Sequence, residues 1–275
     1  MNNSQQVSQA NHIMKRPFQP VMTTIALAAA MLLAGVPALA GTITHSDNGT
    51  YNYPPLNAAG DSVEVYNSTT VNVFEGGEIA LDIMMGFDEL RANDNSVVNI
   101  LGGQVGVARA DGNSTINISG GTMLGIATTY GHGTMNITGG TFDHWVWAQS
   151  NGEVNITGGT FDDNLYSFHS ASLNLSGGVV GGKLDTNHDS TMTVFGTGFN
   201  FAYGDYQISD ILNGANLTGF LADGTAINSL VVIEETSMVT LAAPAIVPEP
   251  STGILSLLGL ARCILSRSRR RSACG

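Results

Sequence analysis

Residues 116–121 read Ile-Asn-Ile-Ser-Gly-Gly, and close copies follow as Met-Asn-Ile-Thr-Gly-Gly at 135–140, Val-Asn-Ile-Thr-Gly-Gly at 154–159 and Leu-Asn-Leu-Ser-Gly-Gly at 173–178. Two earlier copies centre on Asn72 and Asn99, and Met192-Thr193-Val194 is a degenerate last one. The repeated asparagines lie at 72, 99, 117, 136, 155 and 174, so the step after Asn117 is constant at nineteen. The two earlier steps are twenty-seven and eighteen, and the longer one indicates an eight-residue insertion near 82–89.

The alternation within each copy is typical of a β-strand, because two aliphatic side chains share one face and the asparagine points to the other. The Gly-Gly pair that follows permits a sharp turn. Two further apolar positions recur after it, at Met123, Phe142, Phe161 and Val180, and at Ala127, Val146, Leu165 and Leu184. One such unit cannot bury a core, but stacked copies align these positions into a continuous interior, with the asparagines forming a ladder.

The pattern resembles the right-handed parallel β-helix over roughly residues 63–198. We therefore predict an all-β chain: a single-stranded parallel β-helix, or β-solenoid, with nineteen-residue coils. Terminal rungs are open sheet edges that need cover. We expect residues 41–62 to cap one end, and residues 199–246, which leave the register of the repeat, to form a small C-terminal β cap.

The charge of the body is strongly acidic. The 275-residue chain has a formal net charge of −12, and between residues 41 and 250 the only basic residues are Arg91, Arg109 and Lys183. So few cations cannot neutralise phosphates, which argues against a nucleic-acid partner and equally against anionic polysaccharide. Neutral or cationic partners, or partners bridged by divalent ions, are expected.

Residues 1–40 have the features of a cleavable signal peptide, which would engage the secretion machinery. Lys15 and Arg16 precede an uncharged apolar run over 21–36, and Ala38 and Ala40 form the small-x-small cleavage pattern. We expect the cut after Ala40. A transmembrane anchor is the alternative, although the run is short. Met14 is an alternative start that would leave a shorter signal.

Residues 247–275 have the layout of a C-terminal sorting signal. Pro248-Glu249-Pro250 precedes an apolar stretch over 253–261, and a basic cluster follows at Arg267, Arg269, Arg270 and Arg271. This tail resembles the PEP-CTERM family. The resemblance implies an exosortase-type processing enzyme as partner, transient membrane insertion of the tail, and sorting to the cell surface or extracellular matrix. Arg262 interrupts the apolar stretch, which is shorter than the ~20 residues of a spanning helix.

A polysaccharide-degrading enzyme is the rival hypothesis, since extracellular β-helices often cleave polysaccharides. The lyases use a cluster of basic residues, whereas the three basic residues of this body lie in separate copies. The hydrolases combine several aspartates with a Gly-His-Gly and an Arg-x-Lys. Gly131-His132-Gly133 and Asp162-Asp163 occur here, but in reversed order and without the Arg-x-Lys. We predict no catalytic residues.

A binding surface is predicted from the outward columns of the repeat. The fifth residues after Gly-Gly are Ile126, Trp145, Asn164 and Lys183, and the seventh are Thr128, Trp147, Tyr166 and Asp185. Trp145, Trp147 and Tyr166 should therefore cluster on the outside of adjacent rungs, near His144 and Asp163, where flat rings can stack on sugars. The alternative is that a loop or the C-terminal cap covers them.

No cofactor and no metal site are predicted. Asp82, Asp88, Glu89 and Asp94 could ligate Ca²⁺, but the glycine–aspartate nonapeptide of calcium β-rolls is missing, and surface charge is the simpler interpretation. The sequence therefore favours an exported, non-catalytic structural or interaction protein that contacts extracellular polysaccharide.

Overall fold

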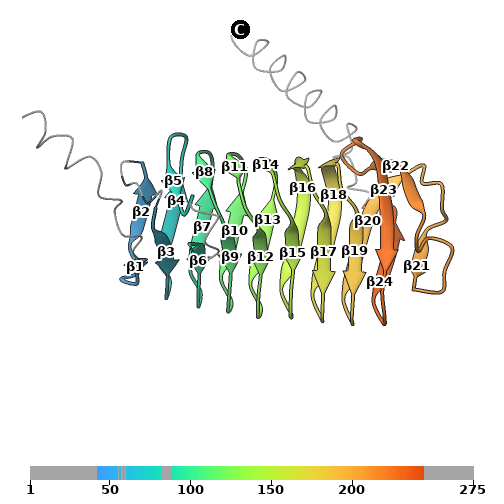
Figure 1. Ribbon diagram of the computed structural model, residues 1–275, viewed down its shortest axis with the longest axis horizontal. Coiled ribbons are helices and arrows are strands. Elements are labelled where there is room, and N and C mark those ends of the chain that lie inside the picture. The colour runs from blue at the N-terminus through green and yellow to red at the C-terminus, as the bar shows by residue number, and fades with distance from the viewer. Residues whose placement is uncertain (1–41, 55, 57, 59, 82–87, 245–275) are drawn as a thin grey trace, which may run out of the picture. The chain divides into compact units, whose positions relative to one another are not determined.

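The computed structural model describes residues 42–54, 56, 58, 60–81 and 88–244. All regular elements in these ranges are β-strands, and they stack as a parallel solenoid, which confirms the predicted fold class (Figure 1). The expected signal peptide, with Ala38 and Ala40, and the expected sorting tail lie outside the described residues. Within the described ranges, no helix has the length and hydrophobicity needed to span a bilayer.

Each coil contributes one strand to a first face of the solenoid, and neighbouring coils pair in parallel there. The strands of this face are β1 (Thr42–His45), β3 (Ser62–Val65), β6 (Leu90–Ala92), β9 (Ala108–Ala110), β12 (Ala127–Thr129), β15 (Val146–Ala148), β17 (Leu165–Phe168), β19 (Leu184–Asn187) and β23 (Ala226–Ile233).

The apolar–Asn–apolar phrase forms the second face, where Asn99, Asn117 and Asn136 pair in direct register. The strands of this face are β2 (Thr50–Tyr53), β4 (Thr70–Val73), β7 (Val97–Ile100), β10 (Thr115–Ile118), β13 (Thr134–Ile137), β16 (Glu153–Phe161), β18 (Ser172–Val180), β20 (Thr191–Thr197) and β24 (Met238–Ala242). A third, short face follows the Gly-Gly turn: β5 (Glu78–Ile79), β8 (Gln104–Val105), β11 (Thr122–Met123), β14 (Thr141–Phe142) and the ends of β16 and β18.

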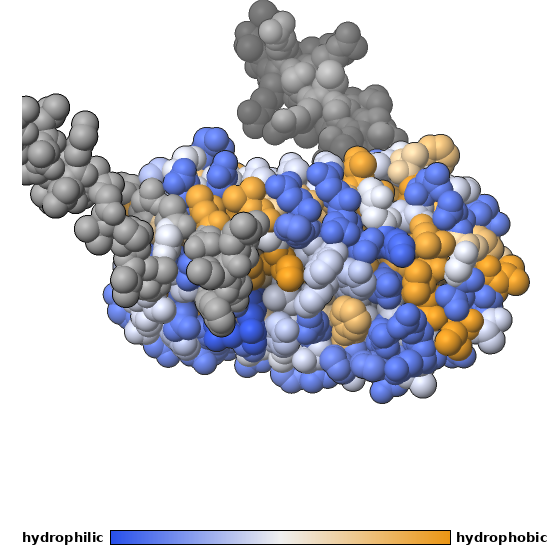
Figure 2. All heavy atoms as spheres, in the orientation of Figure 1, coloured by the Kyte–Doolittle hydropathy of each residue, from blue (hydrophilic) through white to orange (hydrophobic). Residues whose placement is uncertain are grey.

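The apolar columns form one continuous core, as the repeat predicts. Ile118, Ile137, Ile156 and Leu175 are all buried, and Phe142 stacks on Phe161 of the next coil with ring centroids 4.8 Å apart. Val180 is only partly buried. The outer surface seen in Figure 2 is mostly hydrophilic, with small hydrophobic patches. The aliphatic columns are therefore the main source of stability in this cysteine-free body.

The predicted asparagine ladder is present, and it is one step longer than the sequence indicated. The Nδ2 of each asparagine donates to the Oδ1 of the asparagine in the preceding coil at 2.9–3.1 Å, from Asn174 down to Asn72. Asn72 in turn donates to Asn52 Oδ1 at 2.9 Å. The asparagine amides satisfy one another's hydrogen-bonding groups along the solenoid. The stacking of the coils therefore explains the regular spacing of the asparagines in the sequence.

Residues 42–53 are not a separate cap, as we expected for 41–62, but a regular rung. Ile43 pairs with Val63 and Tyr51 pairs with Val71, both in parallel register. In β2, Tyr-Asn-Tyr replaces the apolar–Asn–apolar phrase, and no Gly-Gly follows it. This copy was therefore not recognised from the sequence pattern. The insertion near 82–89 lies between β5 and β6; residues 82–87 are outside the described ranges, and the coils on either side stay in register.

The C-terminal segment combines a cap with a last rung. β21 (Gly204–Tyr206) and β22 (Asn216–Leu221) pair in antiparallel fashion with β24 and with β20 and β23. The chain then returns to the solenoid, because β23 and β24 continue the parallel stacking on β19 and β20. The C-terminal β cap is therefore confirmed for the antiparallel strands, whereas the residues after them rejoin the repeat.

Asp223 links this cap to the Gly-Gly pair of β18 through hydrogen bonds. Its carboxylate accepts hydrogen bonds from the backbone N–H of Gly178 at 2.9 Å, from the N–H of Thr225 at 2.8 Å and from the Thr225 hydroxyl at 2.9 Å. Partial burial opposes ionisation, but these donors outweigh it and hold the pKa of Asp223 below its usual 3.8.

We expect the cap to weaken in acid. A depressed folded-state pKa stabilises the fold fully above the unfolded pKa, and the contribution disappears as pH falls through the folded value. Asp223→Asn should therefore lower the melting temperature by a few degrees at pH 6, and the difference should disappear as the pH falls below the lowered pKa of Asp223. Thermal unfolding of both proteins between pH 2 and 7 measures this. Parallel curves across that range would contradict the role of the carboxylate.

Candidate binding surface

The three predicted aromatic residues come together on the outside of the first face. Trp145 immediately precedes β15 and Trp147 lies within it, one on each side of the buried Val146 in the sequence, and Tyr166 of β17 pairs directly with Trp147. All three side chains are partly buried. The partial burial of these three side chains does not require the C-terminal cap, because the aromatic rings cover one another.

The rings form a packed cluster with defined geometry. The two indoles are stacked, with centroids 5.3 Å apart and planes 8° apart. Tyr166 meets both edge-on, at 6.0 Å from Trp145 and 6.1 Å from Trp147. Offset-stacked and edge-to-face pairs are the favoured arrangements of aromatic rings, so the cluster is held rigidly.

Phe168 is a fourth member that the sequence analysis missed. It stacks on Tyr166 at 5.5 Å and meets Trp147 edge-on at 6.0 Å. Only the fifth and seventh residues after Gly-Gly were considered as outward positions, whereas β17 extends to Phe168, the ninth. The same period of two would have identified it.

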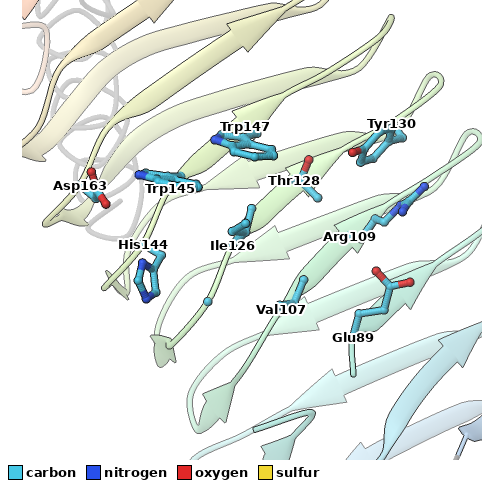
Figure 3. Close-up of a pocket in the computed structure, with 11 residues that line it drawn as sticks. Glu89, Val107, Arg109, Ile126, Thr128, Tyr130, His144, Trp145, Trp147 and Asp163 are labelled. Atoms are coloured by element: carbon cyan, nitrogen blue, oxygen red, sulfur yellow. The ribbon is translucent and has the colours of Figure 1, made fainter. Parts of the chain in front are cut away.

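A hollow of about 550 Å³ lies against the tryptophan side of this cluster (Figure 3). The outward side chains at Val107, Ile126 and Thr128 on the two preceding rungs are smaller than those at Trp145 and Trp147. The remaining lining side chains are Glu89, Arg109, Tyr130, His144 and Asp163. Thr128 points outward as predicted, but only 6% of its surface is exposed.

Two of the charged side chains that line the hollow, Arg109 and Glu89, form ion pairs. Arg109 Nη2 lies 3.0 Å from Asp111 Oδ2, and its guanidinium sits 3.9 Å above the centre of the Tyr130 ring. Arg91 Nε lies 2.8 Å from Glu89 Oε1. These pairs balance one another and Asp163 adds a carboxylate, so the hollow has no surplus of cations, which suits a neutral, hydroxyl-rich ligand better than a polyanion.

The indole N–H of Trp147 is shielded from solvent and has no hydrogen-bond partner among the described residues. It is therefore unavailable to a ligand in this geometry. Trp147 would contribute through its ring rather than as a hydrogen-bond donor, whereas His144, Asp163 and Glu89 supply polar groups at the hollow.

The hydrolase-like motifs do not meet. His132 lies in the turn between β12 and β13, while Asp162 and Asp163 lie in the turn before β17, at the opposite ends of first-face strands. Asp163 Oδ1 accepts a hydrogen bond from its neighbour Asn164 N at 2.8 Å. The histidine and the two carboxylates therefore do not share a centre.

Asp185 is the one described carboxyl with a large shift. Burial, and then the nearby negative charge of Glu234, raise its pKa to about 6, against the opposing charge of Lys183. It follows Tyr166 on the next rung, in direct register, but does not line the hollow. It lies beside the aromatic cluster as an acid that changes charge near neutral pH.

The acidic residues considered for calcium have separate partners. Ser62 Oγ donates to Asp88 Oδ1 at 3.3 Å, and Asp94 Oδ2 accepts from Asn67 N at 3.1 Å. Glu89 pairs with Arg91, and Asp82 lies outside the described ranges. In the part of the chain that the structure describes, no three metal-ligating side chains gather.

No protein-family description, curated protein or solved structure matches this chain significantly. The class of the molecule is therefore defined by its own geometry: a parallel β-solenoid with an aromatic-walled hollow on its first face. The predicted sorting residues Pro248, Glu249, Pro250, Arg267, Arg269, Arg270 and Arg271 lie outside the described residues.

Proposed function

We propose that this chain is an exported, surface-sorted or matrix-associated β-solenoid that acts as a rigid, non-catalytic scaffold and binds neutral extracellular polysaccharide. The observation that carries the binding role is the cluster of Trp145, Trp147, Tyr166 and Phe168 beside the hollow. Partly exposed large aromatics that pack rigidly beside a cavity are characteristic of binding sites.

The chemistry of the surface supports a sugar ligand. Aromatic rings present flat apolar area to the C–H face of a pyranose, and the polar groups of His144, Asp163 and Glu89 can exchange hydrogen bonds with hydroxyls. The paired arginines and the net charge of −12 favour an uncharged chain over an acidic one.

The export role is supported by the two ends of the sequence. The signal peptide with its cut after Ala40 and the tail that resembles PEP-CTERM proteins both indicate passage across a membrane. The secretion machinery and an exosortase-type enzyme are the processing partners that this route implies. The solenoid between them then spaces the binding surface from the anchored end.

The test is retention of the secreted protein on a panel of insoluble neutral and acidic polysaccharides. Trp145→Ala/Trp147→Ala should weaken binding to the neutral members at least about tenfold, because each buried aromatic contributes about 1.5–3 kcal/mol and about 1.4 kcal/mol corresponds to tenfold. Phe74→Ala, which removes a 40% exposed aromatic outside the first face, should bind like the unchanged protein.

Two outcomes would contradict the proposal. Unchanged retention of the double variant, with an intact melting transition, would exclude the aromatic cluster as the site. New reducing ends or unsaturated products after incubation would establish the rival polysaccharide-degrading activity.

A further inference from the structure

The two ends of the solenoid are finished differently (Figure 1). At the C-terminal end, β21 covers the outer edge of β24, and β22 pairs with β20 and β23. At the N-terminal end, β1 pairs only with β3 and β2 only with β4 among the described residues. One end is therefore closed by antiparallel strands, and the other presents strand edges.

The apolar interior at the N-terminal end is nevertheless closed by side chains. His45 and Tyr53 are buried and share a hydrogen bond between Nε2 and the hydroxyl at 3.0 Å, and Tyr51 stacks on His45 with centroids 3.7 Å apart. These rings replace the next rung as a cover for the core. Among the described residues, these rings cover the core and not the backbone edge of β1 and β2.

The unpaired backbone groups can be assigned by alternation. His45 O accepts from Tyr66 N at 2.9 Å, and Gly49 O accepts from Thr70 N at 2.9 Å. Because successive residues of a strand direct their N–H and C=O to opposite sides, those of Thr44 and Thr50 face away from the second rung. Each strand thus keeps hydrogen-bonding groups for a further strand.

Nothing in β1 or β2 discourages pairing. The strands read Thr-Ile-Thr-His and Thr-Tyr-Asn-Tyr, without the lysine, proline or bulge that commonly protects an edge. β-Branched and aromatic residues of this kind favour strand pairing. Pairing of a further strand at this edge rests on the proposed export, because a cut after Ala40 leaves only Gly41 ahead of β1.

We propose that the N-terminal rung is a self-association surface, on which a second copy of the mature chain pairs through antiparallel strands across a two-fold axis. Head-to-tail stacking is blocked because β21 and β22 occupy the other end. A two-fold contact needs only one kind of surface, and it joins two rods end to end with the aromatic surfaces at a distance from the joint. The strands are short, so the dimer is a weak one.

The test is sedimentation equilibrium of the secreted protein over a wide concentration range, with its N-terminus read by mass spectrometry. The unchanged protein should show a monomer–dimer equilibrium. Thr44→Pro/Thr50→Pro removes edge donors, and Thr44→Lys/Thr50→Lys sets like charges against one another. Each should raise the dissociation constant on the order of tenfold. Thr70→Lys, on the fully paired β4, should leave it unchanged.

The outcomes separate this inference from the export proposal. A protein that begins at Gly41 and stays monomeric at every concentration would overturn the self-association and leave export intact. A protein that retains residues 1–40 would contradict the export proposal, and the lysine variants would still report whether the edge mediates pairing. Equal dimerisation of the unchanged protein and the folded lysine variants would place the interface elsewhere.

Discussion

Replacing Phe161 with alanine is expected to destabilise the solenoid by about 3–5 kcal/mol, the usual cost of removing a buried aromatic side chain. Phe161 is 1% exposed and stacks on Phe142 in the adjacent coil, so its loss leaves a cavity inside the continuous core. Neighbouring backbone also encloses it, because a Cβ at Gly178 would lie 3.2 Å from the Phe161 ring.

Chemical denaturation followed by circular dichroism measures this effect. Phe220→Ala is the matched control, since Phe220 is 53% exposed on β22 and its truncation should change stability by no more than about 0.5 kcal/mol. Equal midpoints for the two variants would mean that the phenylalanine column does not form the core. That result would contradict the arrangement of the core as stacked coils.

The second large effect is expected at the Gly-Gly turn, where Gly103→Ala should destabilise the protein by about 2–5 kcal/mol, the sum of two costs. Gly103 has a φ of +77°, which costs a residue with a Cβ about 1–2 kcal/mol. Its Cβ would also lie 2.4 Å from Gly77 O and 2.7 Å from Phe74 O, and relieving such overpacking costs a further ~1–3 kcal/mol.

Gly76→Ala separates the two causes. Gly76 has nearly the same φ, +79°, but a Cβ there would meet no atom within 4 Å. It should therefore show only the conformational cost of about 1–2 kcal/mol. Denaturation of the two variants side by side measures the difference. Identical losses would show that the coils do not approach as closely at the turn as the structure places them.

The binding surface depends on the same stacking that these variants probe. Trp147 and Tyr166 are one full repeat apart in sequence, yet they lie in direct register on neighbouring strands. A disturbed core would shift the rungs and disperse the cluster. Stability and sugar retention should thus be measured on each variant, so that a loss of binding through unfolding is recognised.

The repeat alone was sufficient to predict the solenoid, the asparagine ladder and the meeting of Trp145, Trp147 and Tyr166. A constant repeat length brings equivalent positions of adjacent coils opposite one another, so a local pattern defines long-range contacts. Alternation with a period of two then assigns each side chain to the inside or the outside. The rung that contains Tyr51-Asn52-Tyr53 was not predicted, because it lacks the aliphatic residues and the Gly-Gly pair of the other copies.

Other features were decided by the tertiary structure. The antiparallel pairing of β21 and β22, and the return of β23 and β24 to the parallel stack, follow no period. They depend on which edges remain open once the coils have stacked, and on contacts such as Asp223 with Gly178. The hollow likewise arises where Ile126 and Thr128 lie beside Trp145 and Trp147. Its depth depends on side-chain size and rotamer across several rungs, and a one-dimensional period does not encode these.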